Sequence, residues 1–265
     1  MKRLAISLVI LSTAAIIGAL WYGAGVKLSS PAPVDRPVKA PLPLELREIA
    51  IATPHWAGAP IKIALLAHID VGSPRSQPQQ LDEIVGRVNV ERPDIILLAG
   101  GYVHGDTPQP SRSKADNDTV NWGHAILGDL NAPLGVFAVL GKPDYQYGGD
   151  VVRTNMEMQG INFVDNQAAV VDNRLCVFGI GDENLGNPSD NGYYNCPANF
   201  PIIALMHNPK SASRVPSGTA LMLAGQGTHG LKAVGGGMVL TTTGISASGD
   251  ASIAPQFTLI ELSSP

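Results

Sequence analysis

The chain has 265 residues, of which 45% are hydrophobic and 15% are charged, and its formal net charge is -4. A chain of this length and composition can bury one substantial core. It carries no basic cluster of the kind with which proteins hold a nucleic-acid backbone, so nucleic acid is excluded as a partner.

The N-terminal segment, residues 1–25, is predicted to be a membrane anchor. Lys2 and Arg3 precede an uncharged stretch, residues 4–22, that is long enough to cross a bilayer as a helix. These basic residues in front and the Trp21-Tyr22 pair behind favour an orientation with the N-terminus inside. A cleaved signal peptide is the alternative, although its apolar region usually has only about 7–15 residues.

Residues 26–44 are predicted to form a Pro-rich linker, and residues 45–265 a domain on the far side of the membrane. An oxidising compartment would permit a disulfide between Cys176 and Cys196. The sequence does not supply the distance that such a bond requires, so a disulfide and two unpaired thiols both stay open.

The first half of the domain alternates strands with helices. The pattern predicts strands at residues 61–67, 94–100 and 136–141, and helices at residues 79–93 and 117–131. Later apolar segments predict further strands at residues 174–181, 201–207, 219–225, 237–244 and 257–262. We therefore expect an α/β fold, a layered sandwich of two mixed β-sheets flanked by helices.

Ligands of such sheets gather at the carboxyl ends of the strands. The residues that follow the predicted strands are His68 and Asp70, Gly100 and Gly101, Gly141 to Asp144, His207, and the loop from Gly225 to Gly230 with His229.

In this order, the five strand ends resemble the calcineurin-like metallophosphoesterase superfamily, especially its membrane-anchored bacterial members. The family pattern is Asp-x-His, Gly-Asp, Gly-Asn-His-Asp or Glu, a lone His, and Gly-His-x-His. The resemblance covers residues 45–262. It implies a fold whose active members use two divalent metals, bridged by the Asp of the second block, to activate a water against a phosphoester.

The chain departs from this pattern at most of the implied metal ligands. His207 and His229 match the lone His and the last His of the pattern. The departures are His68 and Asp70, whose residue types are exchanged, Gly101 for the bridging Asp, Lys142 for the Asn ligand, and Pro143 for the His that resembles the general acid.

The resemblance then implies at most one metal site. His68, Asp70 and His229 could offer two imidazoles and a carboxylate to one divalent ion, with zinc, iron and manganese as candidates. The second ion would keep only His207, and it would face the ammonium of Lys142, which repels a cation. A relocated carboxylate such as Asp106 or Asp182 could compensate.

Each candidate residue also has a purely structural interpretation. His68 and Asp70 could hydrogen-bond each other, His207 could cap the following helix, His229 could be a loop residue, and Lys142 a solvated turn residue. Asp144 matches the residue that supports the missing His, so it has nothing to orient. The unmatched histidines His55, His104 and His124 are expected at the surface.

The leading functional hypothesis is a pseudoenzyme without catalytic residues, held in the bacterial inner membrane by one span, with its domain on the periplasmic or extracellular side. It would bind or scaffold, and Lys142 with His207 would hold a phosphate-containing ligand without cleaving it. The alternative is a metal-dependent phosphoesterase with one metal or an altered site. A purely structural part of the envelope is the third hypothesis.

Overall fold

The computed structural model describes residues 43–234, 237–246 and 252–265, all of which lie in one compact unit, Pro41–Pro265. The predicted anchor, residues 1–25, and nearly all of the predicted linker lie outside the described residues. Within the described part, no helix has both the length and the hydropathy of a bilayer-spanning segment.

The first sheet has the strand order β1-β12-β2-β3-β4-β5. Strands β2 to β5 run parallel, β12 pairs antiparallel with β2, and β1 pairs parallel with β12 at the edge. The strands are β1 (Glu45–Ala52), β2 (Ile61–Leu66), β3 (Ile95–Leu98), β4 (Val136–Ala138), β5 (Asn162–Phe163) and β12 (Gln256–Ser263).

The second sheet has the order β10-β11-β9-β8-β7-β6. Strands β7, β8, β9 and β11 are parallel, whereas β6 and β10 pair antiparallel at the two edges. The strands are β6 (Ala168–Val171), β7 (Leu175–Ile180), β8 (Ile202–Met206), β9 (Leu221–Ala224), β10 (Gly230–Val234) and β11 (Gly237–Thr241).

Helices α2 and α3 lie close to their predicted positions, because their apolar residues recur at helical spacing. Helix α2 (Pro78–Val90) buries the predicted Leu81, Ile84, Val85 and Val88. Helix α3 (Lys114–Leu127) begins three residues before the prediction, since the side chain of Ser113 caps it by accepting a hydrogen bond from the Asp116 amide. It ends at Leu127, four residues before the predicted end.

Helix α4 (Lys142–Glu157) was not predicted. The stretch Gly141 to Asp144 forms its N-terminus, with Pro143 in the first turn, where a missing amide hydrogen costs nothing. Gly148, with a φ of 145°, kinks the helix. Short 3-10 helices η1 (Gln109–Ser111), η2 (Asn191–Asn195) and η3 (Pro209–Arg214) lie in the loops.

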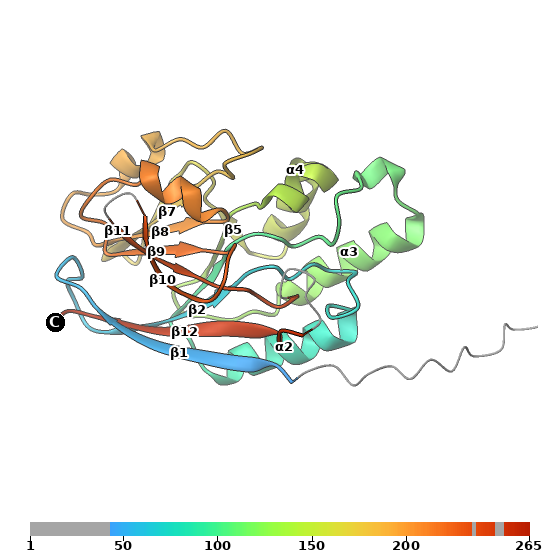
Figure 1. The fold of residues 1–265 in the computed structure, drawn as a ribbon, viewed down its shortest axis with the longest axis horizontal. Coiled ribbons are helices and arrows are strands. Elements are labelled where there is room, and N and C mark those ends of the chain that lie inside the picture. Colours follow the sequence, from blue (N-terminus) through green and yellow to red (C-terminus); the bar gives the residue numbers. More distant parts are fainter. Residues whose placement is uncertain (1–42, 235–236, 247–251) are drawn as a thin grey trace, which may run out of the picture. The chain divides into compact units, whose positions relative to one another are not determined.

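Three apolar layers hold the unit together. One packs helices α2, α3 and α4 on the first sheet, one lies between the sheets, and one lies on the outer face of the second sheet. Figure 1 shows the helices gathered on the side of the first sheet. The predicted fold class, a layered sandwich of two mixed sheets flanked by helices, is confirmed.

The two cysteines form a disulfide. Cys176 in β7 is bonded to Cys196, which follows η2, and their Cα atoms are 5.8 Å apart. Of the two interpretations left open by the sequence, the disulfide is correct. The bond closes a loop that otherwise has little regular structure over the end of the second sheet.

Candidate functional site

The loops after β2 and β3 are joined at the carboxyl edge of the first sheet. The amide of His68 donates to the carbonyl of Gly100 (2.9 Å), and the amide of Asp70 donates to the carbonyl of Gly101 (2.8 Å). His68 and Asp70 have positive φ angles of 45° and 47°, in the left-handed region that residues with a side chain adopt uncommonly, although Asp and His do so more often than most. The two hydrogen bonds hold the backbone in this conformation.

Asp144 is the centre of the polar contacts at this edge. Its fully buried carboxylate accepts hydrogen bonds from the amides of Gly101 (2.8 Å), Tyr102 (2.7 Å), Val103 (3.1 Å) and Gly141 (2.7 Å). Burial raises the pKa of Asp144 to about 7, while the four amides oppose that shift. Asp144 thus does orient something, contrary to the expectation from sequence: it ties the loop after β3 to the start of α4.

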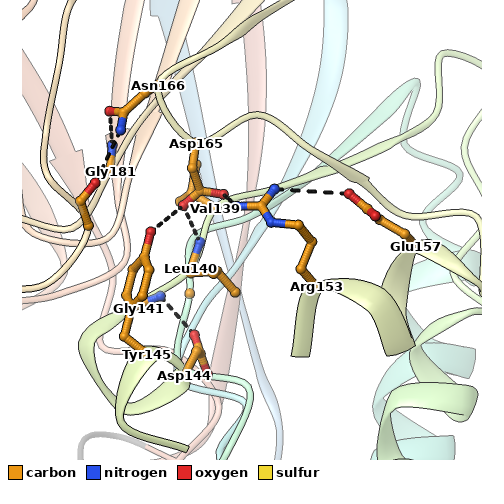
Figure 2. Close-up of polar contacts among 12 residues, drawn as sticks. Val139, Leu140, Gly141, Asp144, Tyr145, Arg153, Glu157, Asp165, Asn166 and Gly181 are labelled. Carbon is orange, nitrogen blue, oxygen red and sulfur yellow. Dashed lines mark hydrogen bonds and ion pairs between the residues drawn. The ribbon is translucent and has the colours of Figure 1, made fainter. Parts of the chain in front are cut away.

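Asp165 fixes the other side of α4. Its carboxylate accepts from the amide of Leu140 (2.8 Å), the hydroxyl of Tyr145 (3.4 Å) and the guanidinium of Arg153 (3.0 Å). Figure 2 shows these groups converging from the segment after β4, from α4 and from the loop after β5. Burial raises the pKa of Asp165, and the Leu140 amide and Arg153 oppose the shift. The two aspartates together position the N-terminus of α4.

His68 and His207 are the predicted site residues that the fold brings together. Both are buried, and their rings meet edge to face with centroids 5.0 Å apart. Burial and the neighbouring His207 lower the pKa of His68 to about 3, and burial also lowers the pKa of His207. Nδ1 of His207 lies 2.8 Å from the carbonyl oxygen of Ala99. A carbonyl only accepts, so Nδ1 carries the proton and Nε2 keeps a lone pair.

Asp70 and His229 interact with other residues than His68 and His207. The hydroxyl of Ser246 donates to the Asp70 carboxylate, and burial raises the pKa of Asp70, with opposing effects from Ser246 and His104. His229 is half-buried, and burial and the charge of Arg47 lower its pKa. Among the described residues, no three His, Cys, Asp or Glu side chains form a group that could hold a metal ion.

The glycines show how tightly this edge is packed. A Cβ atom added at Gly101 would lie 3.1 Å from Cα and Nδ1 of His68. One added at Gly100 would lie 2.7 Å from the amide nitrogen of Gly141 and from Nδ1 of His207. Gly101 stands where the resemblance places the bridging Asp, and a side chain there would lie against the backbone and ring of His68. His68 would have to shift by a few tenths of an ångström to admit it.

Lys142 is exposed in the first turn of α4, whereas His207 is buried. The exposure of Lys142 agrees with its structural interpretation as a solvated turn residue. The anion site itself stays a prediction. The helix after β8 is capped by Asn208, which accepts from the Lys210 amide (3.0 Å), and not by the His207 side chain.

The fold also places His124 and the two carboxylates named as possible replacements, Asp182 and Asp106. His124 is only 1% exposed on α3, so its expected surface position is wrong. It lies four residues after Val120 and three before Leu127, on the buried face of the helix. Asp182 is buried after β7, its charge acts on the pKa of His207, and its Oδ2 has no hydrogen-bond partner among the described residues. Asp106 is exposed.

The chain is similar in sequence or in structure to several known proteins. No protein-family model matches the chain. It is 25% identical over 180 residues to a protein of Aquifex aeolicus (strain VF5) named "Uncharacterized metallophosphoesterase". The match covers 65% of this chain and 64% of the Aquifex protein, just under two thirds of each.

Two solved structures of Thermus thermophilus proteins are also similar. TT1561 shows 16% identity and a TM-score of 0.49, with 70% of this chain and 90% of that chain covered. A 5'-nucleotidase precursor shows 12% identity and a TM-score of 0.45, with 69% and 48% covered. At TM-scores below 0.5, neither likeness bears on function.

The similarity to the Aquifex protein and the arrangement of two mixed sheets flanked by helices support the calcineurin-like metallophosphoesterase superfamily. The resemblance predicted from the strand-end motifs is confirmed at this level.

Proposed function

We propose that this chain is an exported, membrane-tethered protein with a metallophosphoesterase fold that binds a ligand or a partner without hydrolysing a phosphoester. The observation that carries the proposal is the packing at Gly101. The backbone there is tied to Asp144 and lies against His68, in the position where hydrolysis would need a carboxylate between two metals.

Hydrolysis would also need a proton donor and a water-activating group in the same place. Pro143 has no proton to give, and Asp144 is committed to four backbone amides. Both features favour a binding role over a catalytic one.

Export is supported by two independent features. The Cys176–Cys196 disulfide is typical of oxidising compartments such as the periplasm. The uncharged stretch at residues 4–22 and the preceding Lys2-Arg3 favour a single N-in span in a bacterial inner membrane.

Protease added to intact spheroplasts tests this orientation. We expect the protease to reach the domain while the chain stays in the membrane fraction. A shortened product in the soluble fraction would instead indicate a cleaved signal.

The second candidate is a metal-dependent phosphoesterase with an altered site. His207 favours it, because its Nδ1 hydrogen bond to Ala99 leaves Nε2 free to bind a metal, a common arrangement for imidazole ligands. One ion such as zinc, iron or manganese would then need Asp70 and His229 to move toward the His68–His207 pair.

Elemental analysis and phosphatase assays distinguish the two candidates. The purified full chain, incubated with each metal and desalted, is expected to retain well under one equivalent. It should hydrolyse an aryl phosphate no faster than the His207→Ala and His229→Ala variants. Stoichiometric metal together with turnover that depends on His207 would establish the phosphoesterase instead.

A further inference from the structure

The inner face of the second sheet extends beyond the first sheet at the β10–β11 hairpin. The antiparallel register pairs Leu231 with Leu240 and Ala233 with Met238, so Leu231, Met238 and Leu240 point to one face. Leu240 is fully buried in the layer between the sheets. Leu231 and Met238, on the same face, are 46% and 51% exposed. Two side chains on a core-facing surface are therefore uncovered.

A groove of about 540 Å³ lies beneath these side chains. Its opposite wall comes from the end of β1, the edge strand of the first sheet, where Ile51 packs against the core between the sheets. The segment from η3 to the start of β9 forms its base. The volume is within the range of about 300–1,000 Å³ typical of small-molecule sites.

The groove is separate from the candidate site at the strand ends. It is lined by Leu221 at the amino end of β9, whereas the carboxyl end of the same strand leads into Gly225, next to Ala99 at the candidate site.

The lining is suited to a hydrocarbon chain. It contains no Asp, Glu, Lys or Arg, and its one ionisable side chain is that of His55. The remaining polar members, among them Thr53 and Ser217, are neutral hydroxyls. Such a surface offers no counter-charge to a phosphate or an acidic peptide, and it gains most from burying apolar area.

We propose that this groove binds an acyl chain of a membrane phospholipid. The inference rests on the proposed membrane tether. The roughly 20 residues between the uncharged N-terminal stretch and Pro43 can reach at most about 70 Å, so every tethered domain stays close to a bilayer. A phospholipid is thus the apolar ligand that the chain meets at the highest local concentration.

A fluorescence-quenching experiment on the full chain tests this inference. The Met238→Cys variant is labelled with an environment-sensitive fluorophore in the groove. The Met158→Cys variant is labelled in the same way at another exposed methionine position, at the end of α4. The native cysteines do not react while their disulfide is intact. In vesicles of phosphatidylcholine brominated on the acyl chains, emission from position 238 should fall at least twofold more than emission from position 158. Adding Leu231→Asp should remove that difference.

Failure of the tether and failure of the groove give different results. If the labelled chain does not sediment with vesicles, the tether is wrong. Both labelled chains are then titrated with brominated lysophosphatidylcholine below its micelle concentration, which tests the groove directly. Equal quenching at the two positions, or none at position 238, overturns the proposal. Emission at position 238 that responds to protein concentration and not to bromine would assign the groove to a second copy of the chain, and would also overturn it.

Discussion

Asp144 shows how much one buried carboxylate can organise. It accepts four backbone amides from two loops that are about 40 positions apart in sequence. Hydrogen bonds to a charged acceptor are each stronger than neutral ones, and a buried amide left without its acceptor is costly. The geometry of the whole strand-end region therefore depends on this side chain.

Asp144→Asn is expected to lower the free energy of unfolding by about 2–4 kcal/mol, because the amide group of Asn would turn a donor toward backbone donors. Urea unfolding followed by circular dichroism measures the change. The control is Asp106→Asn at an exposed carboxylate, which should stay within about 0.5 kcal/mol of the parent. Equal effects of the two substitutions would show that Asp144 does not hold the loops.

His124 makes stability depend on pH. Burial lowers its pKa from 6.5 to about 4, so between these values the unfolded chain binds the proton and the folded chain does not. The free energy of unfolding should therefore fall as the pH drops from 6.5 to 4, by about 3 kcal/mol from this group.

His124→Leu should remove that part of the acid sensitivity. The measurement is the difference in unfolding free energy between pH 7 and pH 4.5, compared with His55→Leu at an exposed histidine. If the His124→Leu chain loses as much unfolding free energy between these pH values as the parent and the His55→Leu chain do, His124 does not contribute to the acid sensitivity.

At the scale of elements, the loops after β2 and β3 approach so closely that a side chain at Gly101 would meet packed atoms of His68. Gly101 has a φ of 80° and lies against His68, whereas Gly160 has a φ of 84° and has no atom within 4 Å of an added Cβ. The two positions carry the same backbone constraint and differ in the space around them.

Gly101→Asp should therefore lose about 1–3 kcal/mol more unfolding free energy than Gly160→Asp, because the added side chain meets the packed backbone of His68. It should also retain no additional metal, although it restores the residue type of the bridging ligand. Urea unfolding and elemental analysis measure both effects. A Gly101→Asp chain that is as stable as the control and holds metal would show that the site has room for a bridge.

At the scale of the whole molecule, the disulfide is the covalent link between strand β7 of the second sheet and the loop after η2. It joins residues separated by 20 positions. A loop of that size is expected to contribute about 3 kcal/mol, mainly by restricting the unfolded chain.

A chain with Cys176→Ala and Cys196→Ala should therefore unfold at a lower urea concentration than the parent. Reductant should destabilise the parent and leave the double variant unchanged. Titration with a thiol reagent in denaturant, without reductant, should find no thiol in the parent. Two reactive thiols per chain would mean that the bond does not form in the cell.

The sequence alone determined the elements whose pattern is local. Helix α2 is predicted by four apolar residues at helical spacing, and β2, β3 and β8 by apolar runs that end in a turn or a loop. The order of the strand-end residues was enough to indicate the superfamily, because that order reflects the topology of the fold.

Only the tertiary structure decided what the strand ends do. The start of α4 at Gly141 to Asp144 has local signals, namely Pro143 in the first turn and Asp144 at the third helical position. What the local sequence does not show is that three of the four amides that Asp144 accepts come from a distant loop. Likewise, the sequence placed His68, Asp70, His207 and His229 at strand ends but could not measure the distances between them. Side-chain contacts of this kind depend on how the two described sheets pack against each other and against helices α2, α3 and α4, and residues far apart in sequence take part in that packing.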